Sequence, residues 1–340
     1  MDGQTTRRRP TLKTLAQETG LAVTTVSKAL NDAPDIGART KEKVREAARR
    51  LGYRPNRAGI RLRTGRTQVL SFLLTPELDM MSHTAQLIHA LSSELRGTGY
   101  HLIVTPVFDD EDPLEQLRYI VETGSADAVF LNKIRPVDPR IAFLHENNLP
   151  VITHGRSAMG IEHPWYDHDN ARIVELALEA LARRKRRRIL IVAPPMTQNY
   201  ALHIREGALA TADRLGQTVE FLIGATSDSP ADKLEAALVR ELAAGRYDGV
   251  FASSIRSTIN VVAALESLGQ ALGRDVDVAG KEPIPFLQRF RKELISVREN
   301  SADAGTYLAR AALRRLEHPD DPPMQHLEVP TEADLYETPA

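Results

Sequence analysis

Residues 11–31 read TLKTLAQETGLAVTTVSKALN, and the spacing of their apolar residues predicts two short helices. Thr11 is a suitable N-cap for a helix over 12–19, because its hydroxyl can accept a hydrogen bond from a free backbone N–H. Gly20 stands where a helix C-cap requires a positive φ. A second helix over 23–30 follows within a few residues. This arrangement predicts a helix-turn-helix, whose second helix enters the major groove of DNA.

A third helix is predicted over 39–51, because apolar residues recur there at i, i+3, i+4 and i+7. Gly52 ends this helix, and Pro55 prevents its continuation. The segment 56–66, NRAGIRLRTGR, is predicted to form a short, marginal helix followed by a linker. A helix of this length is not stable alone, so we expect it to order only against DNA and a second copy of the chain.

The charge of the chain is divided unevenly, although the whole carries only −1. Residues 1–66 contain sixteen Lys and Arg against six Asp and Glu, and the rest contains 28 basic against 39 acidic residues. A basic N-terminal module suits a polyanion, because each cation that meets a phosphate releases a condensed counterion. Composition alone leaves open the alternative that these charges form an ordinary solvated surface.

Four motifs occur in order: TLKTLA at 11–16, TVSKALN at 25–31, LGYRPN at 51–56 and LRTGR at 62–66. They resemble the lactose-repressor (LacI/GalR) family of transcription regulators, and a three-helix module that binds protein is the alternative. The resemblance implies that base edges are met by Val23, Thr24 and Lys28, and that phosphates are held by Thr25, Ser27, Asn31 and Asn56. It implies that Leu62 is an apolar lever wedged between base steps in the minor groove. We expect the same surface to include Thr11, Leu12 and Arg57.

The chemistry of these residues agrees with the implied roles. Lys28 can donate to guanine O6 and N7, and the methyls of Val23 and Thr24 can touch a thymine methyl.

The chain also departs from the family pattern. Ala22 and Gly37 replace usual Ser caps, Lys28 replaces a usual Arg, and Gly59 replaces a usual Ala in the hinge helix. These departures affect the operator sequence and the affinity rather than the DNA-binding role.

The rest of the chain alternates short apolar runs with helical stretches, which predicts parallel sheets of the doubly wound type. Strands are expected over 69–74, 100–105, 128–131, 151–154, 189–193, 219–223, 249–252 and 276–279. No glycine-rich phosphate loop follows the first strand, where the sequence is Thr75-Pro76-Glu77, and this argues against a nucleotide-binding fold.

Three stretches, LPVITHGR at 149–156, YDHDN at 166–170 and VAGKE at 278–282, resemble the effector-binding region of the same family, which is similar to periplasmic sugar-binding proteins. The expected fold is therefore an N-terminal all-α helix-turn-helix domain followed by an α/β effector domain of two doubly wound parallel-sheet lobes. We expect the helix-turn-helix over 1–55, the hinge helix and linker over 56–66, and an effector-binding and dimerisation domain over 67–340. The resemblance places lobe one at about 67–166 and 297–318, and lobe two at about 167–296 and 319–340.

An effector between the lobes would meet polar side chains at the carboxyl ends of the strands and at the start of a lobe-two helix. These candidates are Thr75, Glu77, Asp79, Asn132, Lys133, His154, Arg156, His203, Arg205, Lys281 and Glu282. Several positions where the family often binds its ligand carry other residues here, such as Gly155, Ile204, Ile255 and the pair Lys281-Glu282. The effector therefore need not be the sugar of any familiar member of the family. A carbohydrate is the first expectation and an organic acid the second.

Two further patterns receive ordinary explanations. The basic run Arg183–Arg188 ends a helix, where cations complement the helix dipole, so we interpret it as a solvated turn rather than a second DNA surface. His163 and His168, with Asp167 and Asp169, do not have the i, i+4 spacing of helical metal ligands. We therefore expect a structural or cleft role for these four residues, and no metal and no cofactor.

The remaining features favour a cytoplasmic homodimer that binds a pseudo-palindromic double-stranded operator. The chain has no cysteine, Arg7 to Arg9 are followed by no apolar signal region, and no apolar run is long enough to cross a membrane. The tail after Val329 has no leucine heptads, so we expect a dimer through the effector domain and no coiled coil. Two other functions are alternatives for this fold. A transport-type binding protein should lack the basic N-terminal module, which this chain has. An enzyme should carry a phosphate loop or a nucleophile elbow, and the sequence shows neither.

Overall fold

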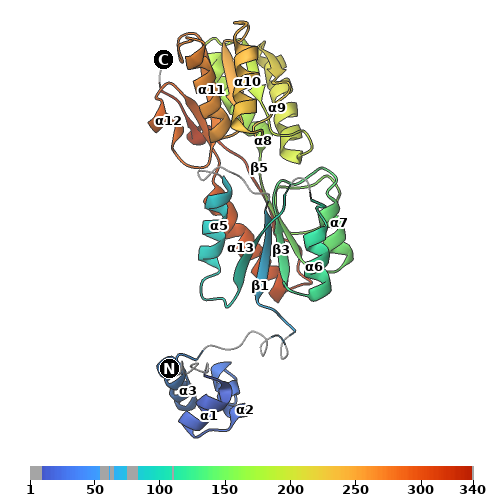
Figure 1. Cartoon of the computed structure of the whole chain (residues 1–340), viewed down its shortest axis with the longest axis vertical. Helices are drawn as coiled ribbons and strands as arrows, with labels where there is room; N and C mark the ends of the chain where they lie inside the picture. Colours follow the sequence, from blue (N-terminus) through green and yellow to red (C-terminus); the bar gives the residue numbers. More distant parts are fainter. Residues whose placement is uncertain (1–9, 54–60, 62–64, 75–82, 109–110, 339–340) are drawn as a thin grey trace, which may run out of the picture. The chain divides into compact units, whose positions relative to one another are not determined.

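The computed structural model describes residues 10–53, 61, 65–74, 83–108 and 111–338, and it divides into two units between Thr67 and Gln68. The first unit contains helices α1 (Leu12–Thr19), α2 (Val23–Leu30) and α3 (Ala38–Leu51) (Figure 1). Thr11 caps α1 as expected, accepting a hydrogen bond from the backbone N–H of Thr14. Gly20 ends this helix with a φ of 67°. The predicted helix-turn-helix is therefore confirmed as a local structure.

One face of each of these three helices packs into a single small core. Its fully or almost fully buried members are Leu15, Val26, Ala29, Val44, Ala47 and Ala48. Every one of them is aliphatic, and a module with so few core residues has little stability to spare. Residues 54–60 and 62–64, which carry the expected hinge helix, lie outside the described residues.

The second unit contains two six-stranded sheets, each covered by helices on both faces. The first sheet has the order β11-β5-β4-β3-β1-β2, and every pairing in it is parallel. Its strands are β1 (Val69–Leu74), β2 (His101–Pro106), β3 (Ala128–Leu131), β4 (Val151–His154), β5 (Trp165–His168) and β11 (Gln325–Glu328). Its helices are α5 (His83–Glu94), α6 (Glu115–Thr123), α7 (Pro139–Glu146) and α13 (Ser301–Glu317).

The second sheet repeats this plan in the order β12-β10-β9-β8-β6-β7, and only the short edge strand β12 is antiparallel. Its strands are β6 (Arg188–Val192), β7 (Thr218–Phe221), β8 (Gly249–Ala252), β9 (Asp277–Glu282), β10 (Ile295–Arg298) and β12 (Leu335–Tyr336). Its helices are α8 (Asn170–Arg183), α9 (Asn199–Leu215), α10 (Ala231–Leu242), α11 (Ile255–Ser267) and α12 (Leu287–Phe290), with a 3-10 turn, η1 (Glu332–Asp334). The expected fold class of two doubly wound lobes is thus confirmed.

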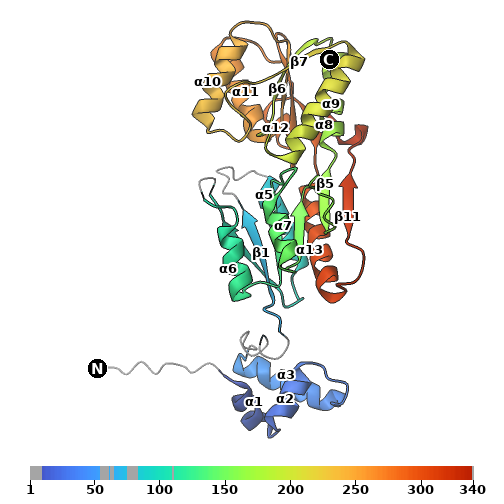
Figure 2. The ribbon, with the colours of Figure 1, turned by 90° about the vertical axis from the view of Figure 1, so that its right-hand side faces the viewer.

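The chain passes between the two lobes three times, after β5, after β10 and after β11 (Figure 2). The expected boundaries lie two residues before the first and second crossings, and the third expected boundary was wrong. Only part of segment 319–340 belongs to lobe two. Its strand β11 belongs to the lobe-one sheet, because it pairs with β5 and places Gln325 opposite Trp165. Likewise β5 lies entirely in the lobe-one sheet and β10 entirely in the lobe-two sheet. β11 is polar and half-exposed, so its place is set by backbone pairing that leaves no apolar pattern in the sequence.

Close helix packing holds each lobe together. In lobe one, α5 and α13 lie side by side (Figure 1), and they approach so closely that a Cβ atom added to Gly305 would come within 2.5 Å of the Leu87 carbonyl oxygen. In lobe two, a Cβ on Gly207 of α9 would lie 2.7 Å from the Cα of Ala171 in α8. Both glycines are therefore required by the approach of a neighbouring helix rather than by a turn.

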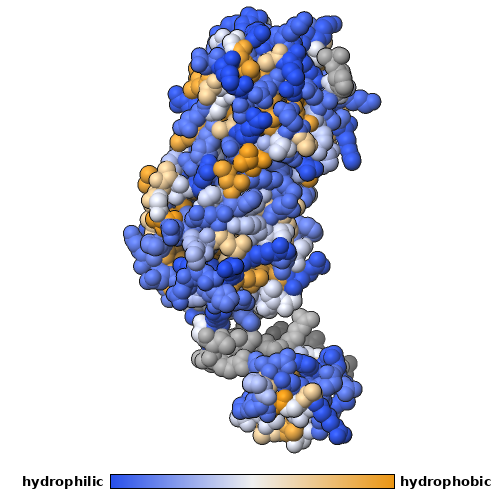
Figure 3. All heavy atoms as spheres, turned by 180° about the vertical axis from the view of Figure 1, so that it is seen from behind, coloured by the Kyte–Doolittle hydropathy of each residue, from blue (hydrophilic) through white to orange (hydrophobic). Residues whose placement is uncertain are grey.

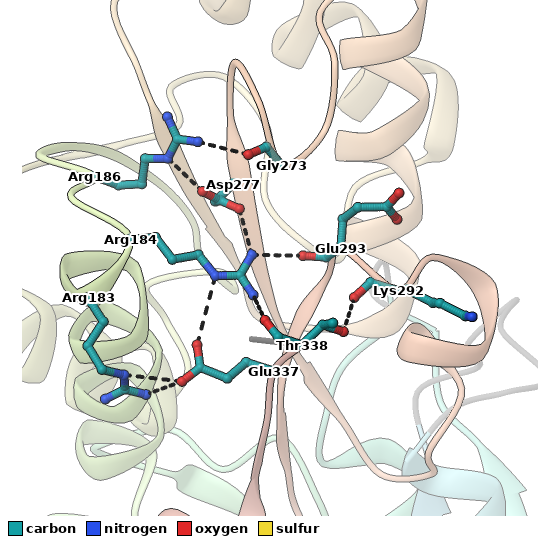
Figure 4. A network of polar contacts seen from close by, with 9 residues as sticks. All are labelled: Arg183, Arg184, Arg186, Gly273, Asp277, Lys292, Glu293, Glu337 and Thr338. Carbon is teal, nitrogen blue, oxygen red and sulfur yellow. Dashed lines mark hydrogen bonds and ion pairs between the residues drawn. The ribbon is translucent and has the colours of Figure 1, made fainter. Parts of the chain in front are cut away.

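The basic run Arg183–Arg188 is not simply a solvated turn. The guanidinium groups of Arg184 and Arg186 both bind the buried carboxylate of Asp277 at the start of β9, at 2.7 and 2.6 Å (Figure 4). Arg183 binds Glu337 at 2.7 Å, and Arg184 also donates to the carbonyl oxygen of Thr338. The run therefore fastens the C-terminal segment and the edge of β9 to the end of α8.

The surface of the second unit is mostly hydrophilic, with small groups of apolar side chains on both lobes (Figure 3). Several large apolar side chains are among the exposed residues, including Ile103 and Val104 on β2 and Ile223 just after β7. β2 and β7 are edge strands of their sheets.

Among the described helices, none combines the length and the apolar character that a membrane span requires.

Candidate functional sites

Helix α2 presents a polar and small-residue face to solvent. Its buried side consists of Val26 and Ala29, and this orientation leaves Val23, Thr24 and Lys28 exposed. Val23 retains 39% of its accessible surface, which is unusual for a valine in a small domain with so little core. The residues expected to meet base edges thus lie together on one exposed side of this helix.

The residues expected to hold phosphates lie around this face. Thr25 and Ser27 are half-buried, Thr11 and Asn31 are exposed, and Leu12 is partly buried against the core. Within the described residues Ala22 makes no side-chain cap on α2, so the first N–H groups of the helix receive no side-chain oxygen there. Asn56, Arg57 and Leu62 lie outside the described residues.

Lys28 has an acidic neighbour within its own unit. Its Nζ lies 2.6 Å from Asp35 Oδ2, and both side chains are more than half exposed. The hydrogen bond from Lys28 lowers the pKa of the Asp35 carboxyl. An exposed ion pair of this kind is weak, so a guanine or phosphate can compete for the ammonium group.

A cavity of about 600 Å³ lies in the second unit and is lined by residues of both lobes. Five of the expected effector-binding residues line it: Asn132, Lys133, His154, Arg156 and Lys281. Thr75, Glu77 and Asp79 fall outside the described residues. The carboxyl ends of parallel strands meet at this edge of each sheet, which explains why residues so far apart in the chain converge here.

Three expected residues are not among those that line the cavity. Glu282 neighbours Lys281 on β9, and successive side chains of a strand point to opposite faces. Its carboxylate accepts hydrogen bonds from the backbone N–H groups of Phe286 and Leu287, so it caps α12. Arg205 is exposed on α9, and His203 lies partly buried on the same helix, near enough to Asp167 to influence its charge.

The two lobes are bridged across the cavity by polar contacts. Lys133 Nζ of lobe one lies 3.0 Å from Asp228 Oδ2 of lobe two. Burial opposes the charge of Asp228, but the ammonium of Lys133 and the hydrogen bonds from Ser227 and Gln198 together hold the pKa of this carboxyl below its ordinary value. The start of α9 also docks on lobe one, where the Asn199 backbone N–H donates to the Ile134 carbonyl at 2.8 Å. The Asn199 side chain donates to the Arg156 carbonyl at 2.7 Å.

We predict that Asp228→Asn will loosen this bridge. A partly buried ion pair of this kind contributes about 1 kcal/mol, so its loss should make opening of the cleft about fivefold more frequent. The measurement is hydrogen exchange of the peptide that contains the Asn199 amide, which should speed up by that factor. Asp232→Asn on the exposed first turn of α10 is the matched control. Equal exchange in the two variants would contradict a role for Asp228 in closure.

Charged groups deeper in the cavity are paired in the same way. Arg156 Nε lies 3.2 Å from Asp167 Oδ2, and burial raises the pKa of Asp167 in spite of this guanidinium. Glu299 is almost fully buried and meets His83 Nδ1 and Lys281 Nζ, each at 2.7 Å. Burial alone would raise the pKa of Glu299, but Lys281 and His83 hold it well below the ordinary range.

Several cavity residues escaped the sequence prediction. They are His83, Gln198, Asn199, Asp228, Ser253, Ser254, Arg256 and Glu299, whereas Asp167 and His168 were expected to have a structural or cleft role and do line the cavity. Ser253 to Arg256 directly follow the strand over 249–252. The expectation that cavity residues lie at the carboxyl ends of strands therefore applied to them and could have identified them. Asp228 lies in the segment between β7 and α10, and His83 is the first residue of α5. Neither residue directly follows a predicted strand, so strand ends did not point to them. His154 is partly buried, and removal of its ring from water lowers its pKa well below the ordinary value.

Comparisons with known proteins match both units of the chain. A family model described as bacterial regulatory proteins, lacI family, matches residues 11–56, and one described as a periplasmic binding protein-like domain matches 178–335. The HTH-type transcriptional regulator AglR of Rhizobium meliloti is 29% identical over 325 residues, which cover 93% of this chain and 90% of AglR. RafR of Escherichia coli, another HTH-type transcriptional regulator, is 32% identical over 200 residues, covering 58% of this chain and 59% of RafR.

Solved structures show the same fold. The lac repressor dimer bound to operator and the anti-inducer ONPF superposes with a TM-score of 0.80 at 18% identity, covering 97% of this chain and 98% of that one. The complex of the transcriptional regulator CelR with cellobiose gives a TM-score of 0.68 at 23% identity, covering 96% and 98%. An N-terminal helix-turn-helix joined to a periplasmic-binding-protein-like domain defines a class of DNA-binding transcription regulators. Residues 11–56 of this chain match the lacI family of bacterial regulatory proteins, and AglR, which is similar over nearly the whole chain, is an HTH-type transcriptional regulator.

Proposed function

We propose that this protein is a transcriptional repressor that acts in the cytoplasm as a homodimer, binds a pseudo-palindromic operator and is controlled by a small molecule in the interlobe cavity. The observation that carries the proposal is the pairing of an exposed reading face on α2 with a polar cavity between two lobes. Neither site needs a catalytic group, because binding alone performs the regulation. The DNA-binding roles of the residues on and around α2 are part of the proposal.

The chemistry of α2 supports direct reading of DNA. Its exposed side offers the methyl groups of Val23 and Thr24 and the ammonium of Lys28, which suit thymine methyls and guanine acceptors. The excess of basic residues over 1–66 supplies the nonspecific attraction to phosphates. A helix of eight residues reads only a few base pairs, so two copies on a twofold-related site would supply the specificity of a repressor.

The pairing of three of the cavity's cations with carboxylates favours a neutral, hydroxyl-rich effector. Lys133, Arg156 and Lys281 are each within 3.2 Å of a carboxylate oxygen, from Asp228, Asp167 and Glu299 in turn. An anionic effector would have to compete with these carboxylates for the cations. A carbohydrate instead donates to the carboxylates and amides and accepts from the cations, so it can use the pairs as they stand. An organic acid remains the second candidate.

Exposed apolar groups on the sheet edges support dimerisation of the second unit. Ile103 and Val104 on β2 are 46% and 41% exposed, and Ile223, just after β7, is 76% exposed. An exposed apolar edge strand is a surface that proteins usually cover, here by a second copy of the chain. Effector binding would act by favouring one setting of the lobes over another. The effector can shift the equilibrium between the two settings only by as much as its binding free energy differs between them, and this difference limits the change in DNA affinity.

The proposal predicts specific, salt-dependent operator binding. In a gel-shift titration, DNA from upstream of the protein's own gene should bind roughly 1000-fold more tightly than random duplex, or better. Affinity for both should fall linearly with the logarithm of salt concentration. A thermal-shift screen of sugars and organic acids would identify the effector, which should then change operator affinity. Equal affinity for a palindromic site and for random duplex would refute the proposal.

A further inference from the structure

Three imidazole rings, those of His83, His154 and His168, come together on the lobe-one wall of the cavity. They come from the first turn of α5 and from the ends of β4 and β5. Their ring centroids are 4.4, 5.6 and 5.9 Å apart, and one ring nitrogen from each lies within 4.8 Å of the other two. The expectation of no metal rested on the spacing of His163 and His168, and 71 positions separate His83 from His154 in the chain.

The outer nitrogens of two of these rings are held by carboxylates. His83 Nδ1 lies 2.7 Å from Glu299 Oε1 and 2.7 Å from Ser301 Oγ. His168 Nδ1 lies 3.1 Å from Glu328 Oε2. An ionised carboxylate only accepts hydrogen bonds, so each Nδ1 carries the proton, and each Nε2 of a neutral ring then presents a lone pair.

The Nε2 atoms of all three histidines are buried and have no hydrogen-bond partner within the described part of the chain. Buried polar atoms are seldom left in this state, and each one that is requires an explanation. The lone pairs of neighbouring neutral imidazoles cannot satisfy one another, because a hydrogen bond needs a donor. A bound cation would satisfy all three nitrogens at once.

We propose that His83, His154 and His168 bind a divalent transition-metal ion, with zinc as the best match. Neutral imidazole suits such ions, and a carboxylate on the second ring nitrogen is the arrangement that usually orients a metal-binding histidine. Zinc–nitrogen bonds of about 2.1 Å bring tetrahedral ligands to about 3.4 Å from one another. The rings must therefore move inward by roughly 1 Å, which small side-chain rotations can provide. Three protein ligands leave a fourth position open toward the cavity.

The proposal goes beyond the regulatory function and stands on the histidine cluster alone. The competing explanation is that hydroxyl groups of the effector donate to the three Nε2 atoms. That explanation predicts no zinc binding, so the experiment below separates the two.

The test uses the full chain, stripped of metal with a chelator and titrated with zinc by calorimetry. We expect one ion per chain and a thermal midpoint that rises with zinc. His154→Gln should weaken zinc binding at least about tenfold, whereas His145→Gln, on the exposed end of α7, should leave it unchanged. Circular dichroism checks that both variants are folded. A wild-type chain that takes up no zinc, or equal zinc binding by the two variants, overturns the proposal.

Cobalt provides a second measurement that needs no substitution. Bound to the unmodified chain, Co²⁺ should show the intense visible absorption of a tetrahedral nitrogen-ligated site, and zinc should remove it. A weak spectrum like that of the hydrated ion would count against the site. Operator binding measured in parallel keeps the two proposals separate: operator binding without zinc uptake refutes only the metal site, and zinc uptake without operator binding refutes only the repressor function.

Discussion

Val26→Asp is expected to abolish specific operator binding while the second unit remains folded. Val26 is fully buried in the core shared by the three helices of the first unit. An unpaired carboxylate in such a core costs several kcal/mol, which is comparable with the whole stability of a small domain. The first unit should therefore unfold, and operator affinity should fall at least about 100-fold, toward the nonspecific level.

The matched control is Gln17→Asp, which adds the same charge to an exposed position on α1. It should keep most of the specific affinity, since the three-helix core is untouched. Differential scanning calorimetry of Val26→Asp should show the transition of the second unit at its original temperature, because the two units are separate by their contacts. Operator binding that survives in Val26→Asp would show that the helix-turn-helix is not the DNA-binding element.

The second large effect is expected for Asp277→Ala. The carboxylate of Asp277 is 1% exposed and binds two guanidinium groups, those of Arg184 and Arg186 (Figure 4). Removing it leaves two cations that are only 11% and 18% exposed without their shared partner. Breaking a buried pair in this way costs about 3–5 kcal/mol, and the partial exposure of the arginines favours the lower end.

Urea denaturation of the second unit measures this loss directly. Asp320→Ala provides the matched control, because Asp320 is exposed in the turn after α13. The control should leave the free energy of unfolding nearly unchanged. A loss below about 1 kcal/mol for Asp277→Ala would mean that the basic run is no more than a solvated surface.

Particular elements show how far local patterns can be trusted in this chain. The strands expected over 69–74, 128–131, 151–154 and 249–252 appear with those bounds, because each is a buried apolar run of a parallel sheet. Helix α1 begins and ends where Thr11 and Gly20 predict, because caps are made by neighbouring residues. β5, β10, β11 and β12 were not foreseen, since these short edge or near-edge strands carry polar residues and are held in place by backbone pairing.

The candidate cavity was predictable in part for a similar reason. Strand ends pointed to Asn132, Lys133, His154 and Arg156, because the carboxyl ends of parallel strands share one edge of a sheet. The partners of these residues were not predictable. Asp228 reaches Lys133 from the other lobe, and Glu299 reaches His83 from a crossing segment. Those pairings depend on how two sheets face each other, which no local spacing records.

The amino-acid sequence alone determined the helix-turn-helix, its basic charge, the two-lobed α/β fold and the family resemblance. All of these depend on patterns within one element or on the order of elements along the chain. Only the tertiary structure decided where the chain crosses between lobes, which charges pair across the cavity, and that three distant histidines meet with their Nε2 atoms unpartnered among the described residues. The physical reason is that these contacts join residues tens to hundreds of positions apart, whose proximity arises only when the strands pair and the helices pack.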